Sequence, residues 1–258
     1  ALQRDGPDPA VLPGPEDPRG GRHNTFAGWP SVPGVGLFCE WQVICRGEAD
    51  ERTGYLLGIG EIDAAVREGA IEPLAAALRH DPDAAPACLL AEAARVLDDR
   101  LDGRLHAVRW RLTPFHAVTL ETDRMDRFEI RQQFDFAAAH HLRSPELDDA
   151  ENRRIFGKCT NAHGHNYRVE VAVLVPMPEG AEPPVLTLPA LEQLVDEHLV
   201  DRLDHTDLNR QDDVFGRRLP SVENIARAAH GLLAGAVAAA GAELRQVTVW
   251  ETEKTFCT

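Results

Sequence analysis

The chain has 258 residues, of which 43% are hydrophobic and 27% are charged. This composition is typical of a globular protein and excludes disorder of the whole chain, and the length allows one large domain or two small ones. The 27 Lys and Arg residues against 42 Asp and Glu residues give a net charge of −15, which disfavours binding to nucleic acid or to an anionic membrane surface.

The cysteines and the apolar segments indicate neither an exported nor a membrane-bound protein. The five cysteines are odd in number, widely spaced and without a CxxC pair, which favours a reducing compartment over a disulfide framework. No apolar run reaches the roughly 18 residues that a membrane span requires. The first residues, ALQRDGPDP, lack the basic-then-apolar pattern of a signal peptide. We therefore expect a cytoplasmic protein.

The first half of the chain divides into an arm and a folded stretch. Residues 1–33 are rich in Pro, Gly, Asp and Arg and show no apolar period, so we expect an extended arm. The apolar pattern of residues 34–130 predicts mixed secondary structure. The elements expected there are a strand over 37–45, helices over 62–78 and 85–101, and strands over 105–120.

Residues 131–258 follow the same plan with a clearer pattern. The elements expected there are strands over 134–142 and 166–175, a helix that begins near Pro189, a second helix with Ser221 as its N-cap, and a strand over 245–257. The repeated order of elements predicts an internal duplication. The alternative is one α+β domain with an N-terminal extension.

Three histidines of the second half are placed where their imidazoles can converge. His163 and His165 enter one strand, and alternate residues of a strand share a face. His140 lies on the preceding strand, and His141 is an alternative that lies on the opposite face. Three histidines with a vacant fourth position are typical of catalytic zinc, because structural zinc is closed by four protein ligands. An isolated HxH pair would more often be a surface or core feature.

Cys159 lies in a polar loop four residues before His163. A single cysteine is usually a small buried hydrophobe. Beside a metal and Lys158, however, its thiolate form would be favoured and could act as a nucleophile or a base. Asp204 and His205 are adjacent, and a carboxylate beside an imidazole can relay a proton, although an isolated Asp-His pair carries little information.

Two glutamates complete the set of candidate residues. Glu251 follows the alternating segment Val247-Thr-Val-Trp250 on the last strand, and a carboxylate there can accept two parallel N–H bonds from the amidine edge of a pterin or guanine ring. Its simpler interpretation is an exposed strand acid. Glu223 lies in the first turn of a helix, where an acid that interacts with the helix dipole is the simpler interpretation.

Five segments of the second half together resemble the signature series of the 6-pyruvoyltetrahydropterin synthase and 6-carboxytetrahydropterin synthase family. In chain order they are Phe136-Ala-Ala-Ala-His140-His-Leu142, Phe156-Gly-Lys-Cys159-Thr-Asn-Ala-His163-Gly-His165-Asn-Tyr167, Leu203-Asp-His205-Thr-Asp-Leu-Asn209, Pro220-Ser-Val-Glu-Asn224 and Trp250-Glu-Thr252. The resemblance implies the tunnelling fold (T-fold). This is an α+β module with a four-stranded antiparallel sheet and two helices on one face, and several such modules close a barrel.

The resemblance also implies a role for each candidate residue. Zinc would lie on His140, His163 and His165. The other implied roles are the proton-abstracting thiolate for Cys159, its relay partners for Asp204 and His205, the anchor of the pterin for Glu251, and a place close to the ring for Glu223. Lys158 and Arg143 are candidates for holding the triphosphate.

The spacing of the cysteine loop bears on the substrate. Three residues separate Cys159 from His163, which resembles the bacterial 6-carboxytetrahydropterin synthases of queuosine (7-deazaguanine) biosynthesis. The implied reaction converts 7,8-dihydroneopterin triphosphate to 6-carboxy-5,6,7,8-tetrahydropterin, acetaldehyde and triphosphate. The alternatives are a 6-pyruvoyltetrahydropterin synthase of tetrahydrobiopterin biosynthesis, a non-catalytic pterin- or metal-binding scaffold, and a hydrolytic three-histidine zinc enzyme, which would not need Cys159 or Glu251.

Aligned on the second half, the first half lacks these groups. Val35-Gly-Leu37 stands opposite His163-Gly-His165, Ala75-Ala76 opposite Asp204-His205, Leu89 opposite Glu223, and Arg111 opposite Glu251. We therefore expect residues 34–130 to be a degenerate T-fold module and residues 131–258 to be the catalytic module. Because family members assemble from six single modules, the resemblance implies a homotrimer of two-module chains with three zinc sites.

Overall fold

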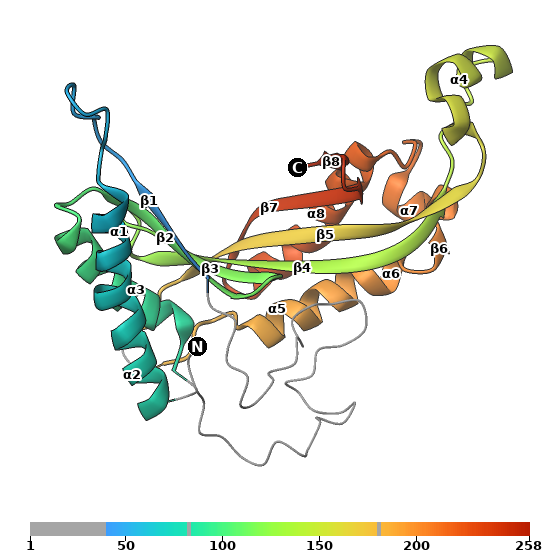
Figure 1. The fold of residues 1–258 in the computed structure, drawn as a ribbon. Coiled ribbons are helices and arrows are strands. Elements are labelled where there is room, and N and C mark those ends of the chain that lie inside the picture. Colours follow the sequence, from blue (N-terminus) through green and yellow to red (C-terminus); the bar gives the residue numbers. More distant parts are fainter. Residues whose placement is uncertain (1–39, 82–83, 180–181) are drawn as a thin grey trace, which may run out of the picture. The chain divides into compact units, whose positions relative to one another are not determined.

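The computed structural model describes residues 40–81, 84–179 and 182–258. The arm expected over residues 1–33 and the segment Val35-Gly-Leu37 lie outside the described residues. The described chain forms two compact units (Figure 1). Unit 1 comprises residues 40–131 and the described part of 174–187, and unit 2 comprises residues 132–173 and 188–258.

Unit 1 is built on three antiparallel strands with helices beside them (Figure 1). The strands are β1 (Glu40–Cys45), β2 (Leu105–Thr113) and β3 (His116–Glu121), and the helices are α1 (Ile59–Val66), the π-helix η1 (Arg67–Ile71), α2 (Glu72–His80) and α3 (Pro86–Arg100). Helix α3 packs on β2 and β3 and buries Leu90 and Leu97 completely. In the sheet Trp41 pairs with Trp110, and their rings stack 5.7 Å apart.

Unit 2 contains the longer strands. The strands are β4 (Arg127–His140), β5 (His163–Pro176), β6 (Thr206–Asp207), β7 (Glu243–Thr252) and β8 (Thr255–Cys257). Their order is β4, β5, β7, β8, and β6 adds a short parallel pairing to β4. The first residues of β4 and the last of β5 belong to unit 1. These elements confirm the predicted α+β class and place His140, His163 and Glu251 on neighbouring strands.

Unit 2 also contains several helical elements. They are α4 (Asp149–Phe156), the 3-10 helix η2 (Gly157–Thr160), α5 (Leu188–Val195), the π-helix η3 (Asp196–Val200), α6 (Asp201–Leu203), the 3-10 helix η4 (Leu208–Arg210), α7 (Asp212–Phe215) and α8 (Val222–Ala239). Helix α8 packs on β7 and β8 through a buried stripe that includes Ile225, Ala229 and Leu233. Ser221 occupies the expected N-cap position, although its side chain bonds none of the free N–H groups of the helix.

The two units share an uncommon helical feature. In each unit an eight-residue α-helix is followed directly by a five-residue π-helix, η1 in unit 1 and η3 in unit 2. Well under about 1% of residues in globular proteins are in π-helices, so two at the same offset are improbable by chance. This coincidence supports the internal duplication, which stays a prediction.

The helical segments of the two units diverge after the π-helix. In unit 1, α2 continues for nine residues through Ala75 and Ala76. In unit 2, α6 ends after three residues at Leu203. No helix in the described part of the chain is both long enough and apolar enough to cross a bilayer.

Candidate metal centre

Three histidines and one glutamate of unit 2 form a compact cluster. His140 ends β4, His163 and His165 begin β5, and Glu251 lies near the end of β7. One potential ligand atom from each of the four residues lies within 4.8 Å of the others. The Nε2 atoms of His140 and His163 are 3.1 Å apart, and Glu251 Oε1 lies 3.2 Å from His140 Nε2 and 3.3 Å from His165 Nε2.

Backbone carbonyls select the tautomer of two of the rings. His140 Nδ1 lies 2.7 Å from the carbonyl oxygen of Pro220, and His163 Nδ1 lies 2.8 Å from that of Asn161. A carbonyl oxygen can only accept, so each Nδ1 must carry the proton. In the neutral ring Nε2 is then left with its lone pair, which is the arrangement that outer hydrogen bonds give to metal-bound histidines.

Three of the atoms that face one another in the cluster are acceptors. The lone pair of His140 Nε2 lies 3.1 Å from that of His163 Nε2 and 3.2 Å from Oε1 of Glu251. His165 Nε2 is buried and has no hydrogen-bond partner among the described residues. Acceptors at these distances repel unless a cation lies among them. Three imidazole nitrogens and one carboxylate oxygen are a donor set that zinc accepts, so the residues present fit a divalent metal.

Burial keeps the imidazoles in the form that binds a metal. The pKa of His140 is lowered from its ordinary value, chiefly by burial, although the Pro220 carbonyl and Glu251 act in the opposite direction. Burial also lowers the pKa of His165, against the opposing charge of Glu251. Both rings are therefore neutral near pH 7, and a metal need not displace a proton from them.

Close packing on neighbouring residues fixes the rings. Tyr167 is fully buried, lies edge-on to His140 and His165 at 6.0 and 5.5 Å, and stacks on Phe136 at 5.0 Å. Between the two β5 histidines, a Cβ on Gly164 would lie 3.2 Å from the carbonyl oxygen of Ala138. Glycine at this position therefore lets β5 approach β4 closely enough for the three histidines to meet.

Asp204 and His205 form a hydrogen-bonded pair beside β4. Asp204 Oδ1 accepts from the N–H of Ala137 at 2.8 Å, and Oδ2 lies 2.7 Å from His205 Nδ1. The backbone N–H of His205 donates to the carbonyl of Ala137 at 2.6 Å, and His205 has the left-handed φ of 56°. The carboxylate orients the imidazole, and the side chain of His205 is 80% exposed to solvent. Neither residue belongs to the metal cluster.

Cys159 lies on η2 and is half-buried. Its carbonyl accepts from the N–H of Leu142 at 2.7 Å, which joins the two ends of the segment that connects β4 to β5. Cys159 is thus tied to β4 two residues beyond His140. The structure does not bring its thiol into the group of four metal-binding side chains.

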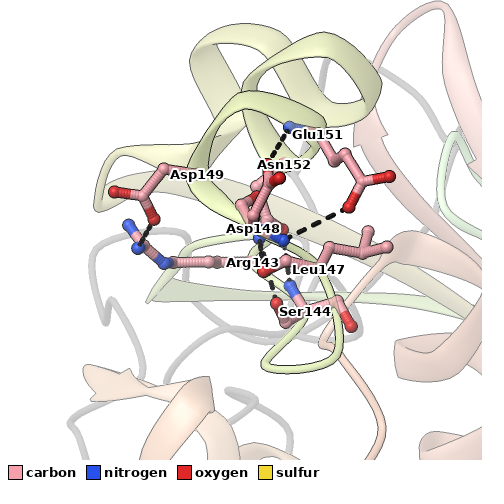
Figure 2. Close-up of polar contacts among 7 residues, drawn as sticks. All are labelled: Arg143, Ser144, Leu147, Asp148, Asp149, Glu151 and Asn152. Atoms are coloured by element: carbon pink, nitrogen blue, oxygen red, sulfur yellow. Dashed lines mark hydrogen bonds and ion pairs between the residues drawn. The ribbon is translucent and has the colours of Figure 1, made fainter.

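The rest of this connection is organised around Asn152 of α4, which is 1% exposed. Its Oδ1 accepts from the N–H of Ser144 at 2.8 Å, and its Nδ2 donates to the carbonyls of Ser144, Leu147 and Asp148 at 2.9 to 3.0 Å (Figure 2). Asp148 and Glu151 add a capping box at the start of α4, and Arg143 pairs with Asp149. The connection from β4 to η2 is therefore an ordered segment, where the sequence pattern predicted only a polar loop.

The remaining candidates lie apart from the cluster. Glu223 is exposed in the first turn of α8, where a hydrogen bond from Ser221 lowers its pKa. His141 is held through its backbone by the side chain of Asn209, which accepts from its N–H at 2.7 Å and donates to its carbonyl at 2.9 Å. Sequence reasoning missed the roles of Pro220, Asn161 and Asn152. The helix-start pattern Asp148-x-x-Glu151 was the one available signal for α4.

Comparisons with known proteins match the half of the chain that contains this cluster. A sequence model of the family described as "6-pyruvoyl tetrahydropterin synthase" matches residues 129–258, half of the chain. The "6-pyruvoyl tetrahydrobiopterin synthase" of Drosophila melanogaster is 40% identical over 93 residues, which cover 35% of this chain and 55% of the relative. The protein of that name from Homo sapiens is 35% identical over 100 residues, 38% of this chain and 68% of the relative.

One solved structure is also similar. The 6-pyruvoyl tetrahydropterin synthase of Caenorhabditis elegans shares 30% identity with a TM-score of 0.46, and the match covers 51% of this chain and 93% of that one. The chain spans about half the length of the Drosophila relative and about two thirds of the human one.

Proposed function

Since the chain belongs to the 6-pyruvoyl tetrahydropterin synthase family, we propose that it is a zinc-dependent lyase that acts on 7,8-dihydroneopterin triphosphate and releases triphosphate. The cluster of His140, His163, His165 and Glu251 carries this proposal, because one potential ligand atom of each residue lies within 4.8 Å of the others. The names of the curated relatives favour 6-pyruvoyltetrahydropterin as the product.

A second candidate product is 6-carboxytetrahydropterin, formed with acetaldehyde. The observation that favours it is the short connection between Cys159 and His163, in which η2 ends at Thr160 and β5 begins three residues later. A longer loop would give the cysteine a different reach over the substrate side chain. The two candidates share the site and differ in which side-chain bond is broken.

The histidines and Glu251 would hold the metal, which as a Lewis acid would polarise hydroxyl and carbonyl oxygens of the substrate side chain. Glu251 presents one carboxylate oxygen to the histidines. It is therefore a candidate fourth ligand in addition to the predicted anchor of the pterin ring. Glu223, exposed at the start of α8, is the other acid available to the amidine edge of the ring.

The remaining residues would handle protons. We assign the removal of a side-chain proton to the thiolate of Cys159, which lies on η2. His205 would return or relay the proton from its exposed Nε2, because Asp204 holds Nδ1 at 2.7 Å and orients the ring. Asp204 is itself fixed by the N–H of Ala137. The imidazole of His205 is therefore oriented before substrate binds.

We further propose a homotrimer of two-unit chains with one zinc site per chain, and a cytoplasmic location. The paired order of elements and the two π-helices support two modules per chain, so that a trimer would contain six. Cys45, Cys88, Cys159 and Cys257 are free thiols, which suits a reducing compartment.

Product analysis on the purified chain tests the catalytic proposal. The protein is incubated with 7,8-dihydroneopterin triphosphate, the products are resolved by mass, and the metal content of the same sample is measured. A 6-pyruvoyl product supports the main proposal, and a 6-carboxy product with acetaldehyde supports the second candidate. We expect Cys159→Ala to retain the metal and lose turnover. Equal turnover in Cys159→Ala and wild type would instead favour a non-catalytic pterin- or metal-binding scaffold.

A further inference from the structure

A cavity of about 330 Å³ lies between α7 and the exposed side of α8. It is distinct from the metal cluster, which lies on the strands of the same unit. Phe215, which is 3% exposed, and Leu232 give it an apolar lining. Its volume is within the range of about 300–1,000 Å³ that small-molecule sites occupy, and its apolar lining offers a surface for a ring or a short apolar group.

The charged groups that line the cavity are mainly cationic. Arg218 and Arg227 both contribute to its wall. Within the described chain, neither guanidinium has a carboxylate within ion-pair distance. The one acid of the lining, Asp213, is engaged by Arg202. Two unpaired guanidinium groups in one cavity are unexpected on a chain with a net charge of −15.

One residue of the cavity lining is a glycine of α8. Gly231 lies in the lining, and a Cβ added to it would meet no atom within 4 Å. Glycine in a helix interior costs about 0.5–1 kcal/mol relative to alanine, and the fold does not require it here. A larger side chain at Gly231 would therefore extend into open space at the cavity.

We propose that this cavity binds a phosphorylated small molecule, with its phosphate groups against Arg218 and Arg227 and its ring or apolar part over Phe215 and Leu232. Guanidinium groups match phosphate oxygens with paired N–H donors. Asn224, another lining residue, uses its Nδ2 to bond the carbonyl of Leu219, which fixes the cavity wall next to Arg218.

Phosphate groups could come from two sources. Pro220, whose carbonyl bonds His140, lies two residues after Arg218, so the cavity wall and the metal centre are connected through a short segment. The phosphate could therefore belong to the triphosphate of the proposed substrate, or to a separate phosphorylated ligand that binds away from the metal centre. The binding proposal itself does not depend on turnover.

Calorimetric titration with inorganic triphosphate tests the site on the full chain in buffer without free metal. Arg218→Gln and Arg227→Gln should each weaken binding by about tenfold or more, the effect of losing a charge-assisted contact. Gly231→Leu should abolish binding because its side chain occupies the cavity. Gly235→Leu is the matched control, since Gly235 is also a helical glycine with no atom within 4 Å of an added Cβ but does not line the cavity.

The comparison of the two leucine variants decides the proposal. Any binding of triphosphate at the metal centre is the same in both, so equal dissociation constants for Gly231→Leu and Gly235→Leu would overturn it. Steady-state kinetics separate the two sources. A raised KM in Gly231→Leu, with triphosphate as a competitive inhibitor, identifies the substrate's own phosphates. An unchanged KM with lost triphosphate binding identifies a separate ligand. Absence of turnover contradicts the proposed function and leaves the binding test intact.

Discussion

At the scale of single residues, the metal centre depends on hydrogen bonds made away from it. Pro220 and Asn161 offer carbonyl oxygens to His140 and His163, and this fixes the Nδ1 protons and directs the Nε2 lone pairs inward. Alternation along a strand predicts that His163 and His165 share a face. It cannot predict that Glu251 reaches the same point, because that contact depends on the order β4, β5, β7 within the sheet.

Replacing one cluster histidine should remove the metal. In His163→Gln we expect the zinc content to fall from about one per chain to near zero, because removing one imidazole from a three-histidine site leaves too few ligands at this distance. Metal analysis after dialysis and a zinc titration measure the loss. His141→Gln is the control, since His141 lies outside the cluster. Equal zinc content in the two variants would contradict the assignment of the site.

A buried histidine of unit 1 should make stability depend on pH. Burial lowers the pKa of His116 from 6.5 to about 4, although its Nδ1 lies 3.3 Å from the carbonyl of Arg131. Between these values the unfolded chain binds a proton at His116 and the folded chain does not. The free energy of unfolding is therefore unaffected by His116 above about pH 6.5 and falls as the pH decreases towards 4.

Urea unfolding measures this dependence. From about pH 7.5 to about pH 5, His116 should reduce the free energy of unfolding by about 2 kcal/mol. We expect His116→Gln, which cannot titrate, to show a pH dependence that is smaller by that amount. The cluster histidines titrate alike in both proteins and cancel in the comparison. Parallel pH profiles for the two proteins would show that His116 is not the responsible group.

At the scale of elements, the α+β class and most helices and strands could be predicted from apolar periodicity. The π-helices could not, because their hydrogen-bond register depends on packing against neighbouring helices and strands. The difference in length between α2 and α6 could also not be predicted from the sequence. Alanines at positions 75 and 76 let α2 continue, whereas Asp204 and His205 leave the helix and bond the backbone of Ala137. If the two units are copies, this difference in sequence accounts for a hydrogen-bonded pair in unit 2 and a continuous helix in unit 1.

The segment between β4 and η2 should depend on Asn152. Asn152→Ala removes the side chain that bonds the N–H of Ser144 and the carbonyls of Ser144 and Leu147, at a cost of roughly 2–4 kcal/mol in the stability of this segment. Hydrogen exchange should accelerate at the amides of residues 144–152. The zinc content should stay unchanged, because the cluster is carried by β4, β5 and β7.

Arg153→Ala serves as the control, since Arg153 is exposed on the same helix. Turnover should decline in Asn152→Ala and not in Arg153→Ala, because the carbonyl of Cys159 is joined to the start of this segment at Leu142. Unchanged exchange rates in Asn152→Ala would mean that the capping box and the pair between Arg143 and Asp149 are sufficient to hold the segment.

At the scale of the whole molecule, the two units differ in their metal-binding side chains. Within the described residues a single group of side chains could hold a metal, and it lies entirely in unit 2. The polar side chains along the strands of unit 1 bond one another instead, as Arg111 does with Glu40 at 3.1 Å and Arg109 with Thr119 at 3.0 Å. If unit 1 is a second module, the duplication preserved its helices and strands without a metal site.

Because only unit 2 carries the cluster, the number of zinc ions per chain and the number of chains per assembly can be predicted together. We expect one zinc per chain and, for the proposed trimer, three zinc ions in an assembly of three times 28.4 kDa. Light scattering and metal analysis on one sample give both ratios. His163→Gln should assemble like the wild type without zinc, because assembly of the modules would use their sheets and not the cluster. Two zinc ions per chain would show that unit 1 also binds metal. A monomer at working concentration would contradict the proposed trimer.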